Sequence, residues 1–560
     1  MLENFKFLNR FFTQKLLADY IIFLSTFFIS ISWLATEHYE PWVVFYNEFY
    51  AAVALVLIMF FFINKNIKFP IIIIPLIILS FVPLIHFLIG KVFYFSIGFM
   101  GFIYVSCFWL AIILGFNLSN SIFDRVKIFH YFSRLLLCVG ILTSAIAIFQ
   151  WLNLEKYIPW IRNINENQRP YGNFAQPNNM ATFLIMSLMA CLYLYESKKI
   201  DIKLITISVI IILIGIALSQ SRTAWIISIF IFIYLLIYQY KGIITLNWHY
   251  STLWFVLFIL LIFALPLVGQ IILYFTDLQI VQSRDVILRA TSDISRLGIW
   301  EHLIYALAKE PWWGYGWYQT SVAFSSVNEI IQGPMWVRNA HNFIIDFLLW
   351  NGLVIGIPFL LYFCYIGFFL QKNITSIESV IGMLMVATFL NHAMFEFPQH
   401  YTFFLIPIGF IIGMMLAHKK EIPIFILNRH IFNILPLLGI LVLIMVYREY
   451  EIARAKMLES ILYQNQPQKI QIENPIFLLT EFNHRISWIR TNPYTIKSLE
   501  EIKAIDQLVN SYPIEYNLKK YARLLAFNGY EKEARHQLWR LKVIWKTNLS
   551  YEVLIEDMPR

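Results

Sequence analysis

The chain has 560 residues, of which 59% are hydrophobic and only 14% are charged, and its formal net charge is +9. A soluble protein carries about 25% charged residues, so this composition excludes an ordinary soluble enzyme, a disordered chain and a nucleic-acid-binding domain. Lys and Arg stand in short clusters between apolar runs, as the orientation of membrane helices requires. The sequence therefore predicts an all-α polytopic integral membrane protein.

Long apolar runs predict where the chain crosses the bilayer. A membrane-spanning helix needs roughly 20 apolar residues. Thirteen candidate runs begin near residues 18, 49, 69, 93, 130, 178, 203, 222, 252, 342, 378, 401 and 430. The first run, from about Tyr20 to Leu34, has no cleavage pattern close behind it and is predicted to be a span and not a signal peptide. We expect 12–13 transmembrane helices.

The connections between these runs alternate in charge. One set carries short clusters of positive charge: Lys6, Arg10 and Lys15, Lys65 and Lys68, Arg125 and Lys127, Lys198, Lys199 and Lys203, Lys241, Lys372, and Lys419 and Lys420. By the positive-inside rule this set is cytoplasmic, which places the N-terminus inside and, with an odd number of spans, the C-terminal tail outside.

The opposite set of connections is longer and richer in polar and aromatic residues. It comprises a loop over 152–177, a large loop over 276–340, a short FEFPQH turn and the tail. We expect N-terminal membrane helices over 1–150, a membrane core with these two loops over 151–447, and a helical C-terminal domain over 448–560. In a bacterial inner membrane these loops and the tail are periplasmic, and function is expected there.

The tail alternates charges of both signs with helical periodicity. Its apolar positions recur on one face at Leu518, Tyr521, Ala522, Leu525, Ala534, Leu538 and Leu541. The stretch YPIEYNLKKYARLLAFNGYEKEA has the form of one tetratricopeptide-type helix pair with a glycine at the turn. One such pair cannot bury its own core, so we expect it to dock on loops or on further tail helices. A protein-binding role and a plain helical cap both remain open.

Two polar segments on the expected outer side begin membrane helices. RPYGNFAQPNNMAT, over 169–182, places the amides of Gln176 and Asn178 where the chain enters the bilayer. Helix capping explains one asparagine but leaves the glutamine without a role. SQSRTAW places Arg222 at a membrane boundary, either extending to the headgroups or lining a polar cavity with a partner.

The large loop and the following span supply two more segments. The loop carries Arg284, Arg289 and Arg296, followed by an aromatic cluster, PWWGYGWY, that suits either a membrane-interface belt or a platform for sugar rings. RNAHNFIIDFLLWNG then begins a span at His341 and Asn342. His341 is a group able to take a proton near neutral pH.

The FEFPQHY turn adds a carboxylate to the same side. Glu396 is expected to pair with His341 or an arginine, and Tyr401 lies close by in the sequence. We find no P-loop, no HExxH and no CxxC pair, and the outer loops lack the clustered carboxylates of a Mg²⁺ or Mn²⁺ site. We therefore expect no metal and no cofactor.

Five blocks together carry a family resemblance: GNFAQPNNMAT, SQSRTAW, SRLGIWEHLIYALAKEPWWGYGW, AHNFIIDFLLWNG and FEFPQHY. From about residue 150 to the C-terminus the chain resembles the bacterial protein O-oligosaccharyltransferases of the PglL type, within the superfamily of O-antigen ligases and polymerases. The resemblance implies en bloc transfer of an oligosaccharide from undecaprenyl diphosphate to Ser or Thr of periplasmic proteins or pilin. It also implies a multi-pass protein of the inner membrane that binds no nucleic acid.

The resemblance implies roles at matching positions. His341 falls on the residue that positions and deprotonates the attacking hydroxyl, and Arg222 and Arg296 fall on arginines that hold the diphosphate. Arg284 and Arg289 are supporting candidates for donor binding. Five residues are assigned to positioning the acceptor or the glycan: Gln176 and Tyr401 through the resemblance, and Asn178, Asn342 and Glu396 beside them.

Three alternatives remain open. An O-antigen ligase passes the glycan to a lipid A core sugar, and an O-antigen polymerase extends the glycan itself. Both share the donor with the protein-directed enzyme. A transporter of lipid-linked glycans is the non-enzymatic alternative, but it more often shows two related halves with broken helices, and the sequence has no internal repeat.

Overall fold

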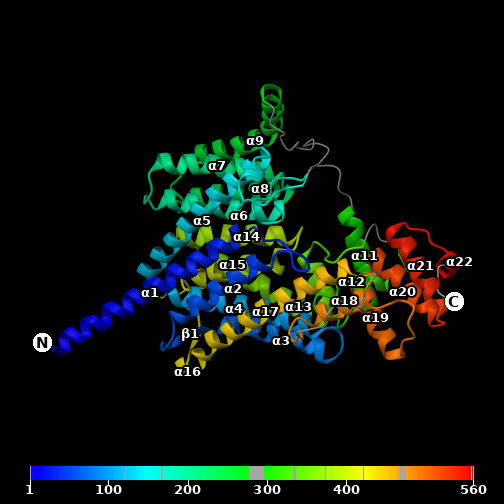
Figure 1. Ribbon diagram of the computed structural model, residues 1–560. Coiled ribbons are helices and arrows are strands. Elements are labelled where there is room, and N and C mark those ends of the chain that lie inside the picture. The colour runs from blue at the N-terminus through cyan, green and yellow to red at the C-terminus, as the bar shows by residue number, and fades with distance from the viewer. Residues whose placement is uncertain are drawn as a thin grey trace. The chain divides into compact units, whose positions relative to one another are not determined.

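The structure is a computed structural model of the chain, drawn in Figure 1. It describes residues 2–119, 121–165, 168–276, 295–331, 336–372, 374–419, 422–464, 466, 469, 475–556 and 558. Helices dominate this part of the chain, and its one sheet has two short strands. The predicted all-α class is confirmed.

The elements follow the chain in this order. The first part holds α1 (Leu2–Leu34), α2 (Phe45–Phe60), β1 (Ile67–Pro70), η1 (Ile71–Ile73), α3 (Ile74–Leu88), α4 (Phe95–Leu118), α5 (Ile122–Trp151), η2 (Glu155–Tyr157), α6 (Pro177–Glu196), α7 (Ile202–Ser219), α8 (Arg222–Tyr240) and α9 (Trp248–Phe275). The second part holds α11 (Ser295–Lys309), α12 (Thr320–Ser326), α13 (Phe343–Gln371), α14 (Ile377–Ala393), η3 (Pro398–His400), α15 (Thr402–Leu416), β2 (Ile424–Leu427), α16 (Arg429–Phe432) and α17 (Ile434–Leu462). The tail holds α18 (Thr480–Arg490), α19 (Leu499–Ser511), α20 (Glu515–Phe527), α21 (Glu531–Trp545) and α22 (Tyr551–Glu556).

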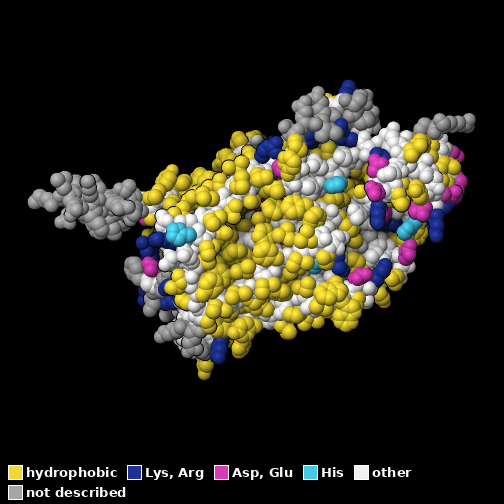
Figure 2. All heavy atoms as spheres, turned by 90° about the horizontal axis from the view of Figure 1, so that it is seen from below, with side chains coloured by type: hydrophobic (Ala, Val, Ile, Leu, Met, Phe, Trp, Pro, Cys, Tyr) yellow, Lys and Arg dark blue, Asp and Glu magenta, His cyan; other side chains and the backbone are white. Residues whose placement is uncertain are grey.

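The helices are apolar enough to make this a multi-pass membrane protein. Among the described residues, 10 helical segments are long and apolar enough to cross a bilayer, and three shorter apolar helices are α2, α14 and α15. Nine of the thirteen predicted starting points fall on these segments, and the other four lie one or two residues before one. On the face drawn in Figure 2, hydrophobic side chains form a broad field and charged side chains gather outside it, as a lipid-facing surface requires.

The described chain divides into two compact units that interleave along the sequence. The first unit takes Met1–Ile77, Tyr104–Ser292 and Ile366–Ile444, and the second takes Ile78–Ile103, Asp293–Tyr365 and Met445–Arg560. Each unit is described by itself below.

Contacts within the first unit group the positively charged connections together. The β1 strand pairs antiparallel with β2, with Ile67 opposite Leu427, although their connections lie more than 350 residues apart in sequence. Arg125 donates to the carbonyl of Ala417 at 3.0 Å. These connections were predicted to share one side of the membrane, and the pairing agrees with that grouping.

Close packing of α4 against α15 depends on two glycines. A Cβ at Gly409 would lie 2.7 Å from the carbonyl oxygen of Phe108, and one at Gly413 would lie 2.1 Å from that of Ile112. Glycines four residues apart let two membrane helices bring their backbones together. A larger residue at either position would separate α4 from α15.

In the second unit the tail helices (orange to red in Figure 1) form their own core. All seven predicted apolar positions of the tail belong to it, together with residues of α18, α19 and α22. Helices α20 and α21 pack as a pair, and the turn between them contains Gly529 at φ +82. The helix pair thus buries its apolar face against neighbouring tail helices, as expected. Its similarity to a tetratricopeptide repeat stays a prediction.

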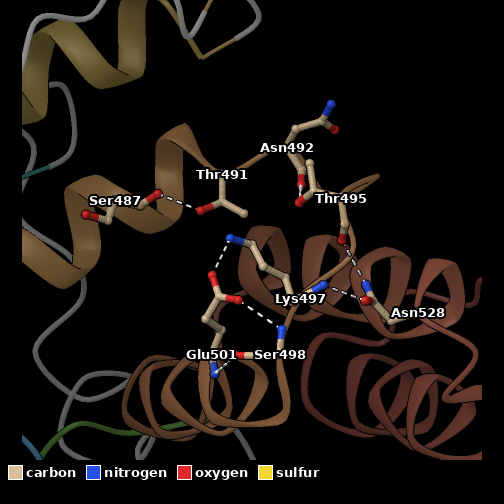
Figure 3. A network of polar contacts seen from close by, with 8 residues as sticks. All are labelled: Ser487, Thr491, Asn492, Thr495, Lys497, Ser498, Glu501 and Asn528. Atoms are coloured by element: carbon tan, nitrogen blue, oxygen red, sulfur yellow. Dashed lines mark hydrogen bonds and ion pairs between the residues drawn. The ribbon is translucent and has the colours of Figure 1, made fainter.

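Polar contacts fix the start of α19, as Figure 3 shows. Ser498 and Glu501 form a capping box, in which each side chain bonds the backbone of the other residue. Asn528, from the end of α20, accepts from the backbone N–H of Lys497 at 2.7 Å and donates to the carbonyl of Thr495 at 2.9 Å. These bonds satisfy backbone groups that a helix start leaves open and hold α19 beside α20.

Candidate active site

The first group of predicted residues meets at the start of α6 in the first unit. Glu396 is buried, with 4% of its surface exposed, and accepts from the amide of Asn178 at 2.9 Å. The amide of Gln176 donates to its other oxygen at 3.4 Å, which is a longer and weaker bond. Glu396 thus bonds two amides of the QPN motif, a pairing that the sequence did not predict. The expected histidine or arginine partner stays a prediction.

The loop before α6 is held rigidly. Gln150 is fully buried; its side-chain oxygen accepts from the N–H groups of Tyr171 and Gly172, and its amide donates to the carbonyl of Gly172 at 2.7 Å. Asn173 donates to the carbonyl of Leu34 at 2.8 Å, and Phe174 packs 5.1 Å from Phe183. These contacts hold the backbone of residues 171–174, directly before the QPN motif, and so fix the position of its amides.

Arg222 is the first residue of α8 and stands two residues after Gln220, whose backbone is left-handed at φ +47. The Ser221 side chain caps the helix by accepting from the N–H of Ala224. On the preceding turn, Arg169 donates to the carbonyl of Ser219 at 2.8 Å. A cation at the end of α7 complements the helix dipole, so Arg169 helps to fix the turn that presents Arg222.

Helix α14 joins the same region of the first unit. Asn391 donates to the carbonyl of Thr223 at 3.0 Å, next to Arg222, and His392 is hydrogen-bonded to the hydroxyl of Thr182 at 2.9 Å. Tyr401 follows η3 at the start of α15, and its ring stacks on Phe403 with 5.0 Å between centroids. The ends of α6, α8, α14 and α15 therefore gather one polar layer.

The second unit holds His341, and its backbone is left-handed at φ +52. This conformation costs a residue with a side chain about 1–2 kcal/mol and persists only where surrounding contacts enforce it. The preceding residue, Ala340, supplies them: its carbonyl accepts from the Trp300 indole at 2.8 Å and its N–H donates to Asp346 at 3.0 Å.

Asp346 connects the backbone before His341 to two further side chains. It is fully buried, and the same oxygen accepts from the Thr320 hydroxyl at 2.6 Å, which in turn accepts from the Trp350 indole at 2.8 Å. The carboxylate lies within electrostatic range of His341. Asn342 accepts from the N–H groups of Ile344 and Ile345, so its side-chain oxygen caps α13.

Arg296 lies in the second unit, on α11. It stands four residues before Trp300, so both side chains lie on one face of the helix, and Trp300 bonds the residue before His341. His302, on the same helix, is fully buried and hydrogen-bonded to the carbonyl of Phe324 at 3.0 Å. Burial lowers the pKa of His302, and its ring centroid lies 4.1 Å from that of Phe324.

The aromatic cluster divides into two parts. Helix α13 is broken at Gly352, where φ is +64, and the PWWGYGW segment fills the break: the N–H of Leu353 donates to Pro311 and that of Tyr315 donates to Leu349. A Cβ at Gly352 would lie 2.2 Å from the carbonyl of Trp312. Trp317 is buried against Trp350, whereas the side chains of Trp312 and Trp313 are 63% and 57% exposed.

The predicted residues thus fall into two sets. Gln176, Asn178, Glu396, Arg222 and Tyr401 belong to the polar layer of the first unit, and Arg296, His341 and Asn342 belong to the second. Arg284 and Arg289 lie outside the described residues. Among the residues that the structure describes, no group of three or more His, Cys, Asp or Glu side chains is placed to hold a metal ion.

Sequence reasoning missed Asp346, Asn391 and Arg169 as supports of the site. Asp346 stands five residues after His341 on an otherwise apolar helix start, and a carboxylate in such a place was itself a signal. Asn391 and Arg169 bond backbone carbonyls, a role that leaves no mark on a single sequence.

Each unit holds residue types that suit transfer chemistry on a charged donor. A guanidinium binds phosphate oxygens with two parallel hydrogen bonds, and Arg222 and Arg296 both stand at or near helix starts. A histidine held in a fixed backbone suits proton transfer. The first unit thus holds Arg222 and amides around a carboxylate, and the second unit holds Arg296 and His341.

Comparisons with known proteins agree with this chemistry. The O-antigen ligase family model matches residues 207–361, the protein glycosylation ligase model matches 170–195, and a model described as the C-terminal part of virulence factor membrane-bound polymerases matches 380–549. A general O-oligosaccharyltransferase of Acinetobacter baylyi is 34% identical over 97% of this chain and 95% of its own length. A ComP-specific O-oligosaccharyltransferase of the same organism is 24% identical over 74% of this chain and 75% of its own.

The fold and these matches define a multi-pass membrane glycosyltransferase of the O-antigen ligase and polymerase superfamily. Within it, the chain belongs to the family of PglL-type general O-oligosaccharyltransferases.

Proposed function

We propose that the protein moves a preassembled oligosaccharide from undecaprenyl diphosphate to Ser or Thr hydroxyls of periplasmic proteins, pilin among them. It acts in the bacterial inner membrane with its N-terminus in the cytoplasm and with its reacting residues and tail in the periplasm. The charge alternation of the connections supports this orientation. The match to general O-oligosaccharyltransferases supports the protein acceptor.

The chemistry follows from the assigned residues. His341 positions the acceptor hydroxyl and takes its proton as the oxygen attacks the anomeric carbon. Arg222 and Arg296 hold the diphosphate and stabilise the charge that grows as it leaves, with Arg284 and Arg289 in support. Direct displacement inverts the anomeric centre. The arginines supply the positive charge, so the proposal assigns no metal or cofactor.

The polar layer of the first unit positions substrate. Gln176 and Asn178 offer amides beside the Glu396 carboxylate, which suits hydroxyl-rich glycans that both donate and accept. Tyr401 and Asn342 are assigned to the same task. The observation that carries the proposal is the backbone of His341, held in a left-handed conformation by bonds to the preceding residue.

The test uses a deletion strain that still makes the lipid-linked glycan. Intact-protein mass spectrometry of its pilin and periplasmic proteins is compared with a gel of its lipopolysaccharide. We expect the oligosaccharide mass to disappear from protein while lipopolysaccharide is unchanged. Loss of O-chains with unchanged protein masses would instead establish a ligase or a polymerase.

Complementation then locates the chemistry. His341→Ala should lower transfer by about 10²- to 10⁴-fold, the usual contribution of a general base. His430→Ala, which changes an exposed histidine at the predicted cytoplasmic start of the last span, should restore wild-type levels. Arg222→Lys keeps the charge but loses the two-pronged bond, and should cost about 10- to 100-fold. Full activity of His341→Ala in a folded protein would remove the proposed base.

A further inference from the structure

Within the second unit, the tail helices contact the part of the large loop that leads into His341. The contacts involve three stretches of the loop, near Ser321, near Glu329 and over 336–338. Their counterparts are Asn510 on α19, His536 on α21 and Tyr512 at the end of α19. The tail helices therefore pack on each other and also contact the large loop.

The central contact is Tyr512, the residue that ends α19. Its hydroxyl accepts from Arg338 at 2.9 Å and donates to Glu481 of α18. The guanidinium of Arg338 lies 5.1 Å from the ring centroid, and that of Arg485 lies 4.9 Å from it. A phenol that interacts with two guanidinium groups and a carboxylate at once is held in one place.

Two further contacts support the same stretch. Trp336 donates to the Ser321 hydroxyl at 2.8 Å, and that hydroxyl donates to the carbonyl of Asn510, two residues before Tyr512. The Trp336 ring packs against the tail core. His536 of α21 lies 3.2 Å from Glu329, but both side chains are exposed, so this pair contributes little.

The stretch held by the tail ends next to His341. Arg338 precedes His341 by three residues, and Ala340 between them is already fixed by Trp300 and Asp346. The backbone over 336–340 is thus tied at one end to the tail and at the other to α11 and α13. The left-handed φ of His341 depends on where this backbone enters α13.

We propose that Tyr512 is a positioning residue for transfer: through Arg338 it lets the tail helices set the backbone that presents His341. This rests on the proposed function, in which His341 reacts with the acceptor. A displacement of about 1 Å at a reacting group costs up to 10²-fold in rate, so losing the Tyr512 contact lowers turnover without removing any group that touches substrate.

The experiment compares full-length variants in nanodiscs with lipid-linked glycan and acceptor protein. Tyr512→Ala and Arg338→Ala each remove the contact, and the double variant tests whether they act together. Tyr512→Phe keeps the ring between the arginines and loses only the hydroxyl. The matched control is Ser498→Ala, which weakens the opposite end of the same helix (Figure 3) without touching the loop.

We expect Tyr512→Ala and Arg338→Ala each to lower kcat about tenfold with the KM for the donor unchanged, and Tyr512→Phe to fall between them and wild type. The double variant should lose no more than either single variant, because both remove one interaction. Ser498→Ala should keep wild-type kcat at a similarly lowered Tm. Amide hydrogen exchange over 336–346 should rise in the Tyr512 and Arg338 variants alone.

Three results would overturn the proposal: equal loss of kcat in Ser498→Ala, losses that multiply in the double variant, or unchanged amide exchange over 336–346. Failure of the proposed function is seen separately. If His341→Ala transfers glycan at the wild-type rate, the role of His341 is wrong, and the exchange measurement alone decides whether Tyr512 positions this backbone.

Discussion

The polar layer at the start of α6 and the His341 segment at the start of α13 use polar residues in opposite ways. In the first, side chains bond side chains: Gln176 and Asn178 both donate to Glu396. In the second, side chains bond the backbone: Trp300 and Asp346 hold the two polar groups of Ala340. The first arrangement shapes what a ligand meets, and the second fixes where one residue lies.

The difference indicates which substitutions should change activity alone and which should also change the stability of the fold. Around Glu396, which is also buried, one changed group alters bonds between side chains and leaves the backbone in place. Around Asp346, one changed group releases a buried hydroxyl and a backbone N–H together, and buried polar groups without partners are costly. Activity and stability should therefore fall together at Asp346 and separately at Glu396.

The largest effect that tests this comparison is expected at Asp346. Asp346→Ala leaves Thr320 and the Ala340 N–H without their acceptor, and should cost about 2–4 kcal/mol of stability and about 10²-fold in transfer. Asp346→Asn keeps one oxygen for both bonds and should lose less of each. Thermal unfolding and kcat in nanodiscs measure the two quantities; wild-type kcat in Asp346→Ala would show that the Ala340 backbone needs no such anchor.

A smaller effect is expected at Glu396. Glu396→Gln keeps the shape, but its NH₂ group meets an amide donor of Gln176 or Asn178, and the charge-assisted bond is lost. We expect transfer to fall about tenfold, mostly through a higher KM for acceptor or donor, with a Tm close to wild type. A fall in kcat with both KM values unchanged would contradict a positioning role and move Glu396 into the chemistry.

Much of the fold was predictable because hydrophobic length and charge placement are local properties. The thirteen apolar runs required only counting, and the tail face from Leu518 to Leu541 followed from helical period. The pairing of β1 with β2 was not predicted. The break in α13 was not predicted. Gly352 carried the signal, but its meaning depended on the PWWGYGW segment about 40 residues earlier, which supplies the missing backbone partners.

The site was predictable in its residue types more than in its contacts. The two amide donors of Glu396 were not predicted, because an amide pair and a cationic partner satisfy a carboxylate equally well from the sequence alone. Asp346 was passed over because its partners, Thr320 and the Ala340 N–H, are set by the fold of the large loop. The contact of Tyr512 with Arg338 joins residues 174 positions apart, a separation that no local pattern spans.

The smallest effect is expected at the capping box that starts α19. This box is exposed to water, unlike the polar layer at α6 and the His341 segment. Two hydrogen bonds, from the Lys497 side chain and then from the Ser498 backbone, lower the pKa of Glu501 to about 2. A carboxyl whose pKa is lower in the folded state stabilises the fold above its unfolded pKa of 4.5, and this contribution is lost as the pH falls towards 2.

Glu501→Gln should therefore raise amide hydrogen exchange at the start of α19 a few-fold near pH 7, and wild type and variant should converge as the pH approaches 2. The matched control, Glu500→Gln, removes an equal charge one residue earlier and leaves the capping box intact, so it should change exchange less. Transfer activity should match wild type in both variants, because the box lies at the end of α19 away from Tyr512. A difference between wild type and Glu501→Gln that persists unchanged at pH 2 would mean that the stabilisation does not come from the ionised carboxylate.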